Sequence, residues 1–191
     1  LLNCEHIILD GLVFKNRGAE RPPTKVAGVR QYGGDVVKIY DSKHITIRKV
    51  VASGWMGTCF DTMTSSHVTY ENCRISHGYG RGISLYDNVP GTPTNYSINN
   101  QIVGCELFNI RRFDEEQVGY SVEALSINGN SMKGTRVTNN YIHDMGHSAC
   151  SIHFDVRFSD AVIEGNLFYN NSGIIGSEID LENRISNVVI R

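Results

Sequence analysis

Apolar residues return at the same positions in six stretches of this chain. The stretches are His6–Asn16, His44–Gly54, His67–His77, Asn99–Asn109, Thr135–Asp144 and Asp160–Asn170. Aligned on one another, they give one column of Leu9, Ile47, Tyr70, Ile102, Val137 and Ile163, and a second of Phe14, Ala52, Ile75, Leu107, Ile142 and Phe168. Every position in both columns is apolar, although only 40% of the chain is hydrophobic. The chain therefore contains an internal structural repeat.

The local pattern within each repeat is that of short β-strands. Apolar and polar residues alternate over short runs rich in Val, Ile, Thr and Tyr, as in Ile45–Ile47 and Val68–Tyr70. Gly, Asn, Asp and Ser bound these runs, as they do at strand ends. No stripe with a 3.6-residue period persists for ten residues, so the pattern predicts strands and no long helix.

The spacing of the repeats favours a solenoid. Along one column of the repeat, the shortest intervals run from Val50 to Cys73 and from Asn140 to Asn166, and the longer intervals carry insertions. A period of roughly 25 residues fits either a leucine-rich repeat or a parallel β-helix. The apolar columns hold Ile, Val, Phe and Tyr as often as Leu, which favours the β-helix.

The repeat resembles that of the right-handed parallel β-helix in the pectate-lyase-like superfamily. Val137–Asp144 and Ile163–Asn170 share a frame in which an Asn follows an apolar residue by three positions and precedes an apolar pair. In that superfamily, Asn side chains stack at a tight bend between sheets, and Asn140 and Asn166 occupy the matching column. Earlier turns carry Leu12, Val50, Cys73 and Cys105 there. The resemblance implies an all-β fold, a right-handed parallel β-helix of about six to seven rungs stacked roughly 4.8 Å apart.

We expect residues 1–191 to form a single β-helix domain that is incomplete at both ends, because a further repeat is only beginning at Val188. Insertions at 17–34, 89–95 and 110–120 are expected to leave the rod as loops. The first and last of these fall at the same place in the repeat, so we expect them to flank one groove.

Composition argues against several classes of partner. The net charge of −2 and the pI near 6.4 provide no basic field for nucleic acid. No apolar run approaches the roughly 18 residues that span a bilayer, so no membrane span is expected.

The five cysteines form no C-x-x-C pair. We interpret Cys73 and Cys105 as reduced residues that stack between rungs.

The strand that follows the two matching insertions carries the candidate catalytic residues. Aligned rung by rung, its last three copies place outward-facing pairs next to one another. These pairs are Ser126/Asn128, His153/Asp155 and Asp180/Glu182. The candidate catalytic residues are His153, Asp155, Asp180 and Glu182. Paired carboxylates can act as acid and base or nucleophile on a glycosidic bond, and an imidazole can abstract a proton. Earlier rungs offer Asp61 and Lys38 to the same strip.

Further residues near this strip are candidates for binding the substrate. They are Tyr86, Arg81, Arg111, Arg112, His147 and His143. Arginine binds carboxylate or sulfate groups in bidentate fashion, and tyrosine offers a surface against which a sugar ring packs. The clustered carboxylates are oxygen ligands of the kind that Ca²⁺ takes, so Ca²⁺ is the one cofactor that the sequence suggests.

Each of these residues also has a structural interpretation. Outward polar residues keep a β-helix soluble, so the three carboxylates are equally explained as a solvated face. His143 and His77 share a column with Asn and Asp residues, which indicates a role in capping a turn. His44 and His67 open strands and are interpreted as turn residues.

The resemblance and the local cluster together predict a carbohydrate-active protein that is secreted, periplasmic or on the cell surface. Its partner would be a polysaccharide or oligosaccharide, which it cleaves or modifies as a glycoside hydrolase or a polysaccharide lyase. Spacing alone does not choose between these two. The alternative is a non-catalytic β-helix module of an adhesin, a phage tail-spike or a glycan-binding protein. An epimerase is a third hypothesis.

Overall fold

A computed structural model gives the structure of the chain, and it describes residues 1–15, 24–26, 29–31, 35–87, 97–111, 122–146, 149–178 and 185–191. Within these residues every regular element is a β-strand. The described part of the chain has no helix long and apolar enough to cross a membrane. The strand content agrees with the alternation of apolar and polar residues in the sequence.

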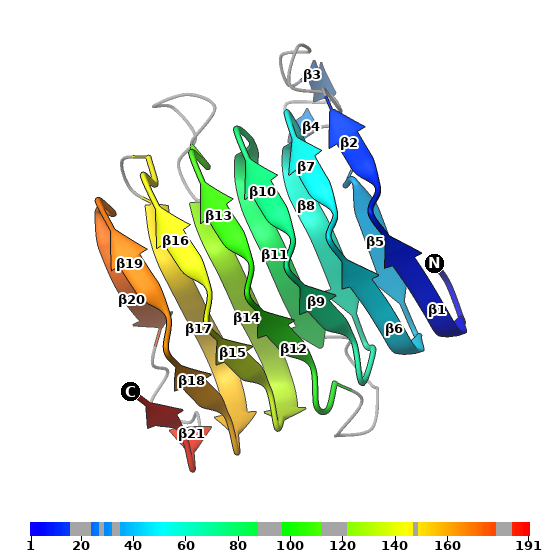
Figure 1. Cartoon of the computed structure of the whole chain (residues 1–191), viewed down its shortest axis with the longest axis vertical. Helices are drawn as coiled ribbons and strands as arrows, with labels where there is room; N and C mark the ends of the chain where they lie inside the picture. The colour runs from blue at the N-terminus through cyan, green and yellow to red at the C-terminus, as the bar shows by residue number, and fades with distance from the viewer. Residues whose placement is uncertain are drawn as a thin grey trace.

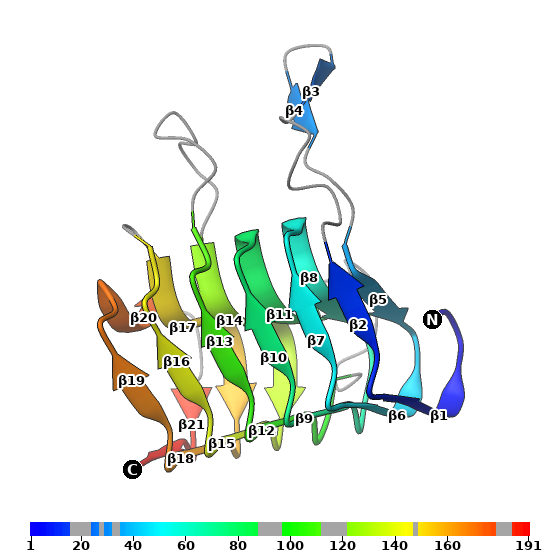
Figure 2. The ribbon, with the colours of Figure 1, turned by 45° about the horizontal axis from the view of Figure 1, so that its top comes forward.

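Three parallel sheets run along the length of the molecule (Figures 1 and 2). The first sheet contains β1 (Glu5–Asp10), β6 (Lys43–Arg48), β9 (Thr69–Glu71), β12 (Gln101–Val103), β15 (Arg136–Thr138), β18 (Val162–Glu164) and β22 (Val189–Ile190). The second contains β2 (Val13–Lys15), β7 (Val51–Ser53), β10 (Arg74–Ser76), β13 (Glu106–Phe108), β16 (Tyr141–His143) and β19 (Leu167–Tyr169).

The third sheet has the longest strands. It contains β5 (Val37–Tyr40), β8 (Met56–Met63), β11 (Tyr79–Asp87), β14 (Val122–Lys133), β17 (Ala149–Ser159) and β20 (Gly173–Glu178), and β21 (Ile185–Ser186) also pairs with β17. An antiparallel hairpin of β3 (Thr24–Val26) and β4 (Val29–Gln31) lies apart from the three sheets (Figure 2). It falls within the first predicted insertion, for which the sequence analysis expected a loop and did not specify strands.

The chain visits the three sheets in turn and then begins the next rung, which is the path of a parallel β-helix. Seven strands of the first sheet give seven rungs, in agreement with the expected six to seven. Both apolar columns are confirmed. Leu9 pairs with Ile47 at one end of the first column and Val137 pairs with Ile163 at the other. Phe14 to Phe168 form the second column in the same way.

The interior is filled by the residues that alternate inward along each strand. Ile47 and Tyr70 of the first sheet, Ile75 of the second and Ile83 and Leu85 of the third are all fully buried in one hydrophobic cluster. A single rung has too little apolar surface to form a core, but stacked rungs turn each column into a continuous strip of buried side chains.

The asparagine ladder at the bend is confirmed, and cysteines extend it. The Oδ1 atom of Asn166 accepts the backbone N–H of Asn140 at 2.9 Å, and Oδ1 of Asn140 accepts that of Cys105 at 2.9 Å. The Sγ atom of Cys105 then accepts the N–H of Cys73 at 3.4 Å. Both thiols donate to carbonyls of the preceding rung, as the Asn140 amide does. All five cysteines are free, and the interpretation of Cys73 and Cys105 as residues that stack between rungs is confirmed.

A second repeating feature is a corner of left-handed residues that precedes the first sheet. His44, His67, Asp160 and Asn187 have φ angles between 53° and 55°. The ring of His44 stacks on that of His67 with 4.7 Å between centroids, and on that of His6 with 4.9 Å. Asn, Asp and His are the non-glycine residues that most often take this conformation. The interpretation as a turn residue is confirmed for His67, whereas His44 has the same left-handed backbone but is the second residue of β6.

The corner that follows the second sheet holds only part of the predicted column. His77, Asn109, Asp144 and Asn170 all have φ between 51° and 58°, so His77 is a turn residue as expected. His143 is not, because it lies in β16 and pairs with Phe108 of β13. The sequence alignment placed His143 in the column of turn residues, but in the structure Asp144, the next residue, occupies that position. Its side chain therefore belongs to the outer face of the second sheet.

The ladder gives a test of what holds the rungs together. Replacing Asn140 with Ala leaves the buried N–H of Cys105 and the carbonyl of Ile102 without their partners, so we expect a loss of about 2–4 kcal/mol in the free energy of unfolding. Asn140→Cys, which restores the thiol used on the two preceding rungs, is expected to lose less. Urea unfolding of both variants measures this. An equal loss in the two would show that side-chain volume, and not hydrogen bonding, sets the stability.

Candidate functional site

A row of polar residues crosses the outer face of the third sheet. The row is Lys38, Asp61, Ser84, Ser126 and His153, each paired in register with the next. Their chain neighbours point into the core, so these side chains point outward. The sequence placed Lys38 and Asp61 in this strip, and the register confirms that placement. It also places Ser126 beside His153, as predicted.

The predicted strand pairing at the last rung of the site is wrong. The strand that pairs with β17 is β20, which places Gly176 opposite His153 and Glu178 opposite Asp155. The expected neighbours of these residues were Asp180 and Glu182. Both of these lie outside the described residues, as do Arg112 and His147 of the predicted substrate-binding set. With this pairing, the chain length from Ile152 to Ile175 equals that from Val50 to Cys73, which is the shortest interval in the repeat.

A bend in the strands of the third sheet places on the outer side a buried carboxylate that the sequence analysis missed. Ala124 and Leu125 are consecutive in β14, and both belong to the hydrophobic core. Glu123 therefore precedes two inward residues and lies on the outer side, in register with Arg81 of β11. Strict alternation of inward and outward residues assigns Glu123 to the interior. The same bend explains why Cys59 and Phe60 are both buried in the core.

Glu123 lies between two basic groups from neighbouring rungs. Its Oε2 atom is 2.9 Å from Nε of Arg81, and its Oε1 atom is 3.0 Å from Nδ1 of His153. Only 1% of the Glu123 side chain is exposed. The backbone of Arg81 is also held, because its carbonyl accepts the indole N–H of the buried Trp55 at 2.9 Å. Arg81 and His153 were predicted to be functional, and this buried carboxylate joins them.

A second ionic cluster occupies the other end of the same row. The Nζ atom of Lys38 is 3.4 Å from Oδ2 of Asp61 and 3.6 Å from Oδ2 of Asp35. The remaining oxygen of Asp35 accepts the backbone N–H of Thr58 at 3.2 Å, which orients the carboxylate. Asp35 precedes β5 and was not identified from the sequence, because it lies before the aligned strand.

The charged groups of this second cluster shift one another's pKa values. Burial raises the pKa of Asp61, and the nearby Asp35 carboxylate raises it further. Lys38 and a hydrogen bond with Ser84 oppose this change only in part. Burial lowers the pKa of Lys38, but the two carboxylates outweigh it and the net change is upward. Asp61 therefore retains its proton to higher pH than an ordinary Asp, beside a charged ammonium group.

Part of the outer face of the third sheet is polar but buried. Ser84, Ser126 and Asn128 are buried, and the Asn128 amide donates to Ser126 Oγ at 3.1 Å. Tyr86, which precedes Asn128 by one rung, is partly exposed. Groups that serve solubility alone remain in contact with water. These three buried residues are therefore not part of a solvated face, while the solvated-face interpretation of Asp155, Asp180 and Glu182 stays a prediction.

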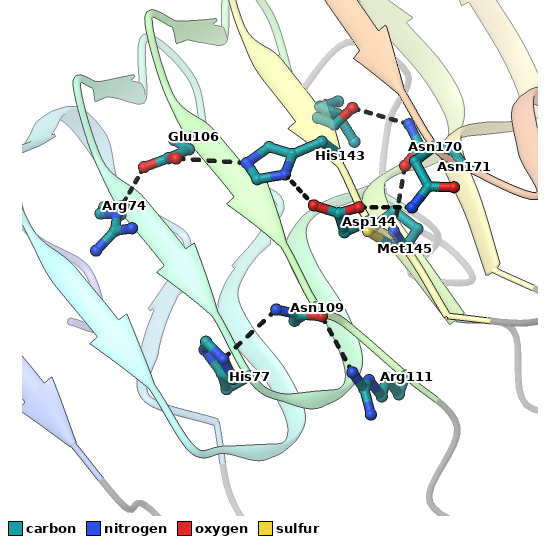
Figure 3. A network of polar contacts seen from close by, with 11 residues as sticks. Arg74, His77, Glu106, Asn109, Arg111, His143, Asp144, Met145, Asn170 and Asn171 are labelled. Atoms are coloured by element: carbon teal, nitrogen blue, oxygen red, sulfur yellow. Dashed lines mark hydrogen bonds and ion pairs between the residues drawn. The ribbon is translucent and has the colours of Figure 1, made fainter.

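The remaining predicted residues lie around the corner between the second and third sheets (Figure 3). The Nδ1 atom of His143 is 2.7 Å from Oδ2 of Asp144, and its Nε2 atom is 3.4 Å from Oε1 of Glu106. The backbone of Arg111 forms an isolated parallel β-bridge with that of Tyr79, and the Arg111 side chain donates to Oδ1 of Asn109 at 3.1 Å. The structure therefore brings Arg81 and His153 together on the third sheet, but it places His143 on the second.

Metal binding receives no geometric support from the described residues. No three His, Cys, Asp or Glu side chains among them are arranged to hold an ion. The carboxylates for which Ca²⁺ was suggested include Asp180 and Glu182, which are outside that part of the chain. The candidate site on the third sheet is thus built from ion pairs between protein groups.

The energetic role of Glu123 can be tested by Glu123→Gln. This change removes the charge between Arg81 and His153 in a buried setting, so we expect the free energy of unfolding to fall by about 2–3 kcal/mol. The matched control is Glu164→Gln, which removes an exposed partner of Arg191 and should cost less than about 0.5 kcal/mol. Chemical unfolding of both variants measures the difference. Similar losses would mean that Glu123 is no more than a surface ion pair.

Comparison with known proteins agrees with the architecture. A family model described as "Right handed beta helix region" matches residues 2–122. One similar solved structure is the catalytic domain of GH87 alpha-1,3-glucanase in complex with tetrasaccharides, with 13% identity and a TM-score of 0.32. The alignment covers 79% of this chain and 40% of that one. Comparison with curated proteins gives no match. The family match over more than half of the sequence and the three parallel sheets show that the chain belongs to the right-handed β-helix family.

Proposed function

We propose that this protein is a glycoside hydrolase that binds a polysaccharide across the outer face of the third sheet, with Asp61 as general acid and Asp35 as general base. The observation that carries the proposal is the pair of carboxylates around Lys38. Both Oδ2 atoms lie near one ammonium nitrogen, at 3.4 and 3.6 Å, so their separation cannot exceed the sum of these two distances. Hydrolysis in which one carboxyl group is the acid and the other activates a water molecule places the two groups about 6.5–9.5 Å apart, and the sum of the two distances reaches the lower end of that range.

The two carboxyl groups have environments suited to different roles. Burial and the neighbouring Asp35 raise the pKa of Asp61, so Asp61 retains its proton to higher pH and can deliver it to the leaving glycosidic oxygen. Asp35 is more exposed and is oriented by the N–H of Thr58, which suits a base that takes a proton from the attacking water. One C–O bond of the substrate breaks, and one bond to the water oxygen forms.

The rest of the row supports the assignment to a polysaccharide. Tyr86 is partly exposed and adds an aromatic ring, and Arg81 and His153 of the same face, with side chains 24% and 15% exposed, add N–H groups. Such groups form the hydrogen bonds and packing contacts that sugars require. Neighbouring rungs are about 4.8 Å apart, so an extended polymer can contact groups from several rungs at once. We propose a secreted, periplasmic or cell-surface location, where structural polysaccharides are accessible to such a protein.

The acid–base assignment is tested with Asp61→Asn and Asp35→Asn. Each change removes one of the two proton transfers, so we expect hydrolysis to fall by about 10²-fold or more. Neutral glucans and polyuronates are incubated with each protein, and new reducing ends are measured. The matched control is Asp10→Asn, which removes an exposed partner of Arg48 on the first sheet and should leave the rate unchanged.

The products separate this proposal from the other functions considered. Reducing ends without an unsaturated product support hydrolysis. An unsaturated product that absorbs in the ultraviolet would identify a lyase and contradict the roles of Asp35 and Asp61. Modification of the sugars without chain cleavage would identify an epimerase. Binding without any of these changes would favour the non-catalytic module.

The raised pKa of Asp61 also has a consequence for stability. Because the folded protein holds this proton more tightly than the unfolded chain, the folded state loses stability as pH rises from the ordinary value of 3.8 through the raised pKa. Asp61→Asn should therefore gain stability relative to the unmodified protein over that range, with a constant difference at higher pH. Unfolding free energies measured across the range check this. A pH-independent difference would show that Asp61 titrates normally.

A further inference from the structure

A cleft lies at the corner that follows the second sheet, next to the network in Figure 3. It has a volume of about 490 Å³ and is lined by Asn109, Arg111, Asp144, Met145, Gly146 and Asn170. These residues come from the ends of three successive rungs, around β13, β16 and β19. The proposed acid–base pair lies on β8 and in the residues just before β5. The two places are therefore at different positions along the rod.

The polar lining of the cleft combines donors and acceptors. The amides of Asn109 and Asn170 carry both kinds of group, Asp144 carries acceptors and Arg111 carries donors. Among the described residues, Nη2 of Arg111 donates a hydrogen bond to Oδ1 of Asn109 at 3.1 Å. A guanidinium has five N–H groups in all. The side chain of Asp144 is 40% exposed, so its carboxylate remains accessible from the cleft.

A rigid support holds the Asp144 carboxylate in place. Its Oδ2 atom is 2.7 Å from His143 Nδ1, and its Oδ1 atom accepts the amide of Asn170 at 2.6 Å. The His143 ring stacks on Phe108 at 4.8 Å and on Tyr141 at 4.1 Å between centroids. The far nitrogen of the ring faces Glu106, which pairs with Arg74 at 2.6 Å. Such pre-organisation lowers the entropy cost of binding a ligand.

We propose that this corner cleft is a second binding site for a neutral sugar unit of the glycan, with Asp144, Asn170, Asn109 and Arg111 as the hydroxyl-binding groups and His143 as a positioning residue. The assignment of the ligand to carbohydrate rests on the proposed function. Each sugar hydroxyl both donates and accepts a hydrogen bond, so it requires the mixed set of groups that lines the cleft. The site would hold the polymer beyond the acid–base pair.

The charge of the cleft argues for a neutral ligand. The one guanidinium among its lining residues, that of Arg111, is matched by the one carboxylate, that of Asp144. The attraction of a charged sugar to one of these groups is opposed by its repulsion from the other, so neither an anionic nor a cationic ligand gains net attraction. The hydrogen bond with His143, and then that with Asn170, lowers the pKa of Asp144, so its carboxylate stays ionised.

The same rungs offer a matched control at another corner. Asp160 and Asn187 have the same left-handed backbone as Asp144 and Asn170, and their side chains form the same amide-to-carboxylate hydrogen bond at 2.9 Å. This second pair does not line the cleft. A change from Asp to Asn is compatible with the fold at either corner, because Asn109 and Asn187 already occupy equivalent positions with φ of 53° and 54°.

The test is a calorimetric titration of the whole chain with neutral tetrasaccharides of glucose in different linkages, and with a tetragalacturonate as the anionic probe. The unmodified protein and Asp61→Asn are both used, so that binding is measured with and without hydrolysis. Asp144→Asn and Arg111→Gln are each expected to weaken binding of a neutral tetrasaccharide roughly tenfold, as loss of a hydrogen bond from a charged group predicts. Asp160→Asn should bind like its parent.

The outcomes separate this site from the acid–base pair. Loss of affinity in Asp144→Asn but not in Asp160→Asn supports the cleft, even when the unmodified protein shows no hydrolysis. Unchanged affinity in Asp144→Asn, or an equal loss in Asp160→Asn, would overturn the proposal. It also fails when none of the neutral tetrasaccharides binds, or when tetragalacturonate binds more tightly than all of them.

Discussion

Parallel hydrogen bonding between successive rungs is the constraint on which the rest of this molecule depends. Each strand pairs with the strands one rung before and after it, so residues far apart in the chain become neighbours. Arg81 and Glu123 are separated by 42 positions, yet a single strand spacing lies between them. The outer face is thus built from columns, and the chemistry of any site on it is decided by which residues the register places side by side.

The register is supported from inside by polar side chains at the bends. Asn166, Asn140 and Cys105 each accept a backbone N–H of the preceding rung, and each returns a hydrogen bond to a carbonyl there. A buried backbone group without a partner would be costly, so these side chains also specify where one sheet ends and the next begins. The outer ion pairs then form on a backbone whose positions are already determined.

The sequence predicted the rod well because its apolar columns report directly on the core. The columns from Leu9 and from Phe14 pair as expected over six rungs. The site was harder to predict, because outward positions follow simple alternation only where the strand is straight. Glu123 was missed because the two residues after it both turn inward. The last rung was misassigned for another reason. The sequence from Ile179 alternates apolar and polar residues as a strand does. The strand that pairs with β17, however, is the earlier one, from Gly173 to Glu178. Stacking against β17 decides between the two, and alternation alone contains no information about that contact.

The unequal lengths of the rungs separate what the fold requires from what it tolerates. The rung from Phe60 to Ile83, like that from Ile152 to Ile175, closes without an insertion. Between Phe14 and Val37 the chain instead accommodates a hairpin, while the flanking strands keep their pairing. Because lengthening a loop adds little entropy cost, segments at such corners can be exchanged during evolution or by design while the register persists. A rod of this kind can acquire a new ligand preference by replacing corners alone.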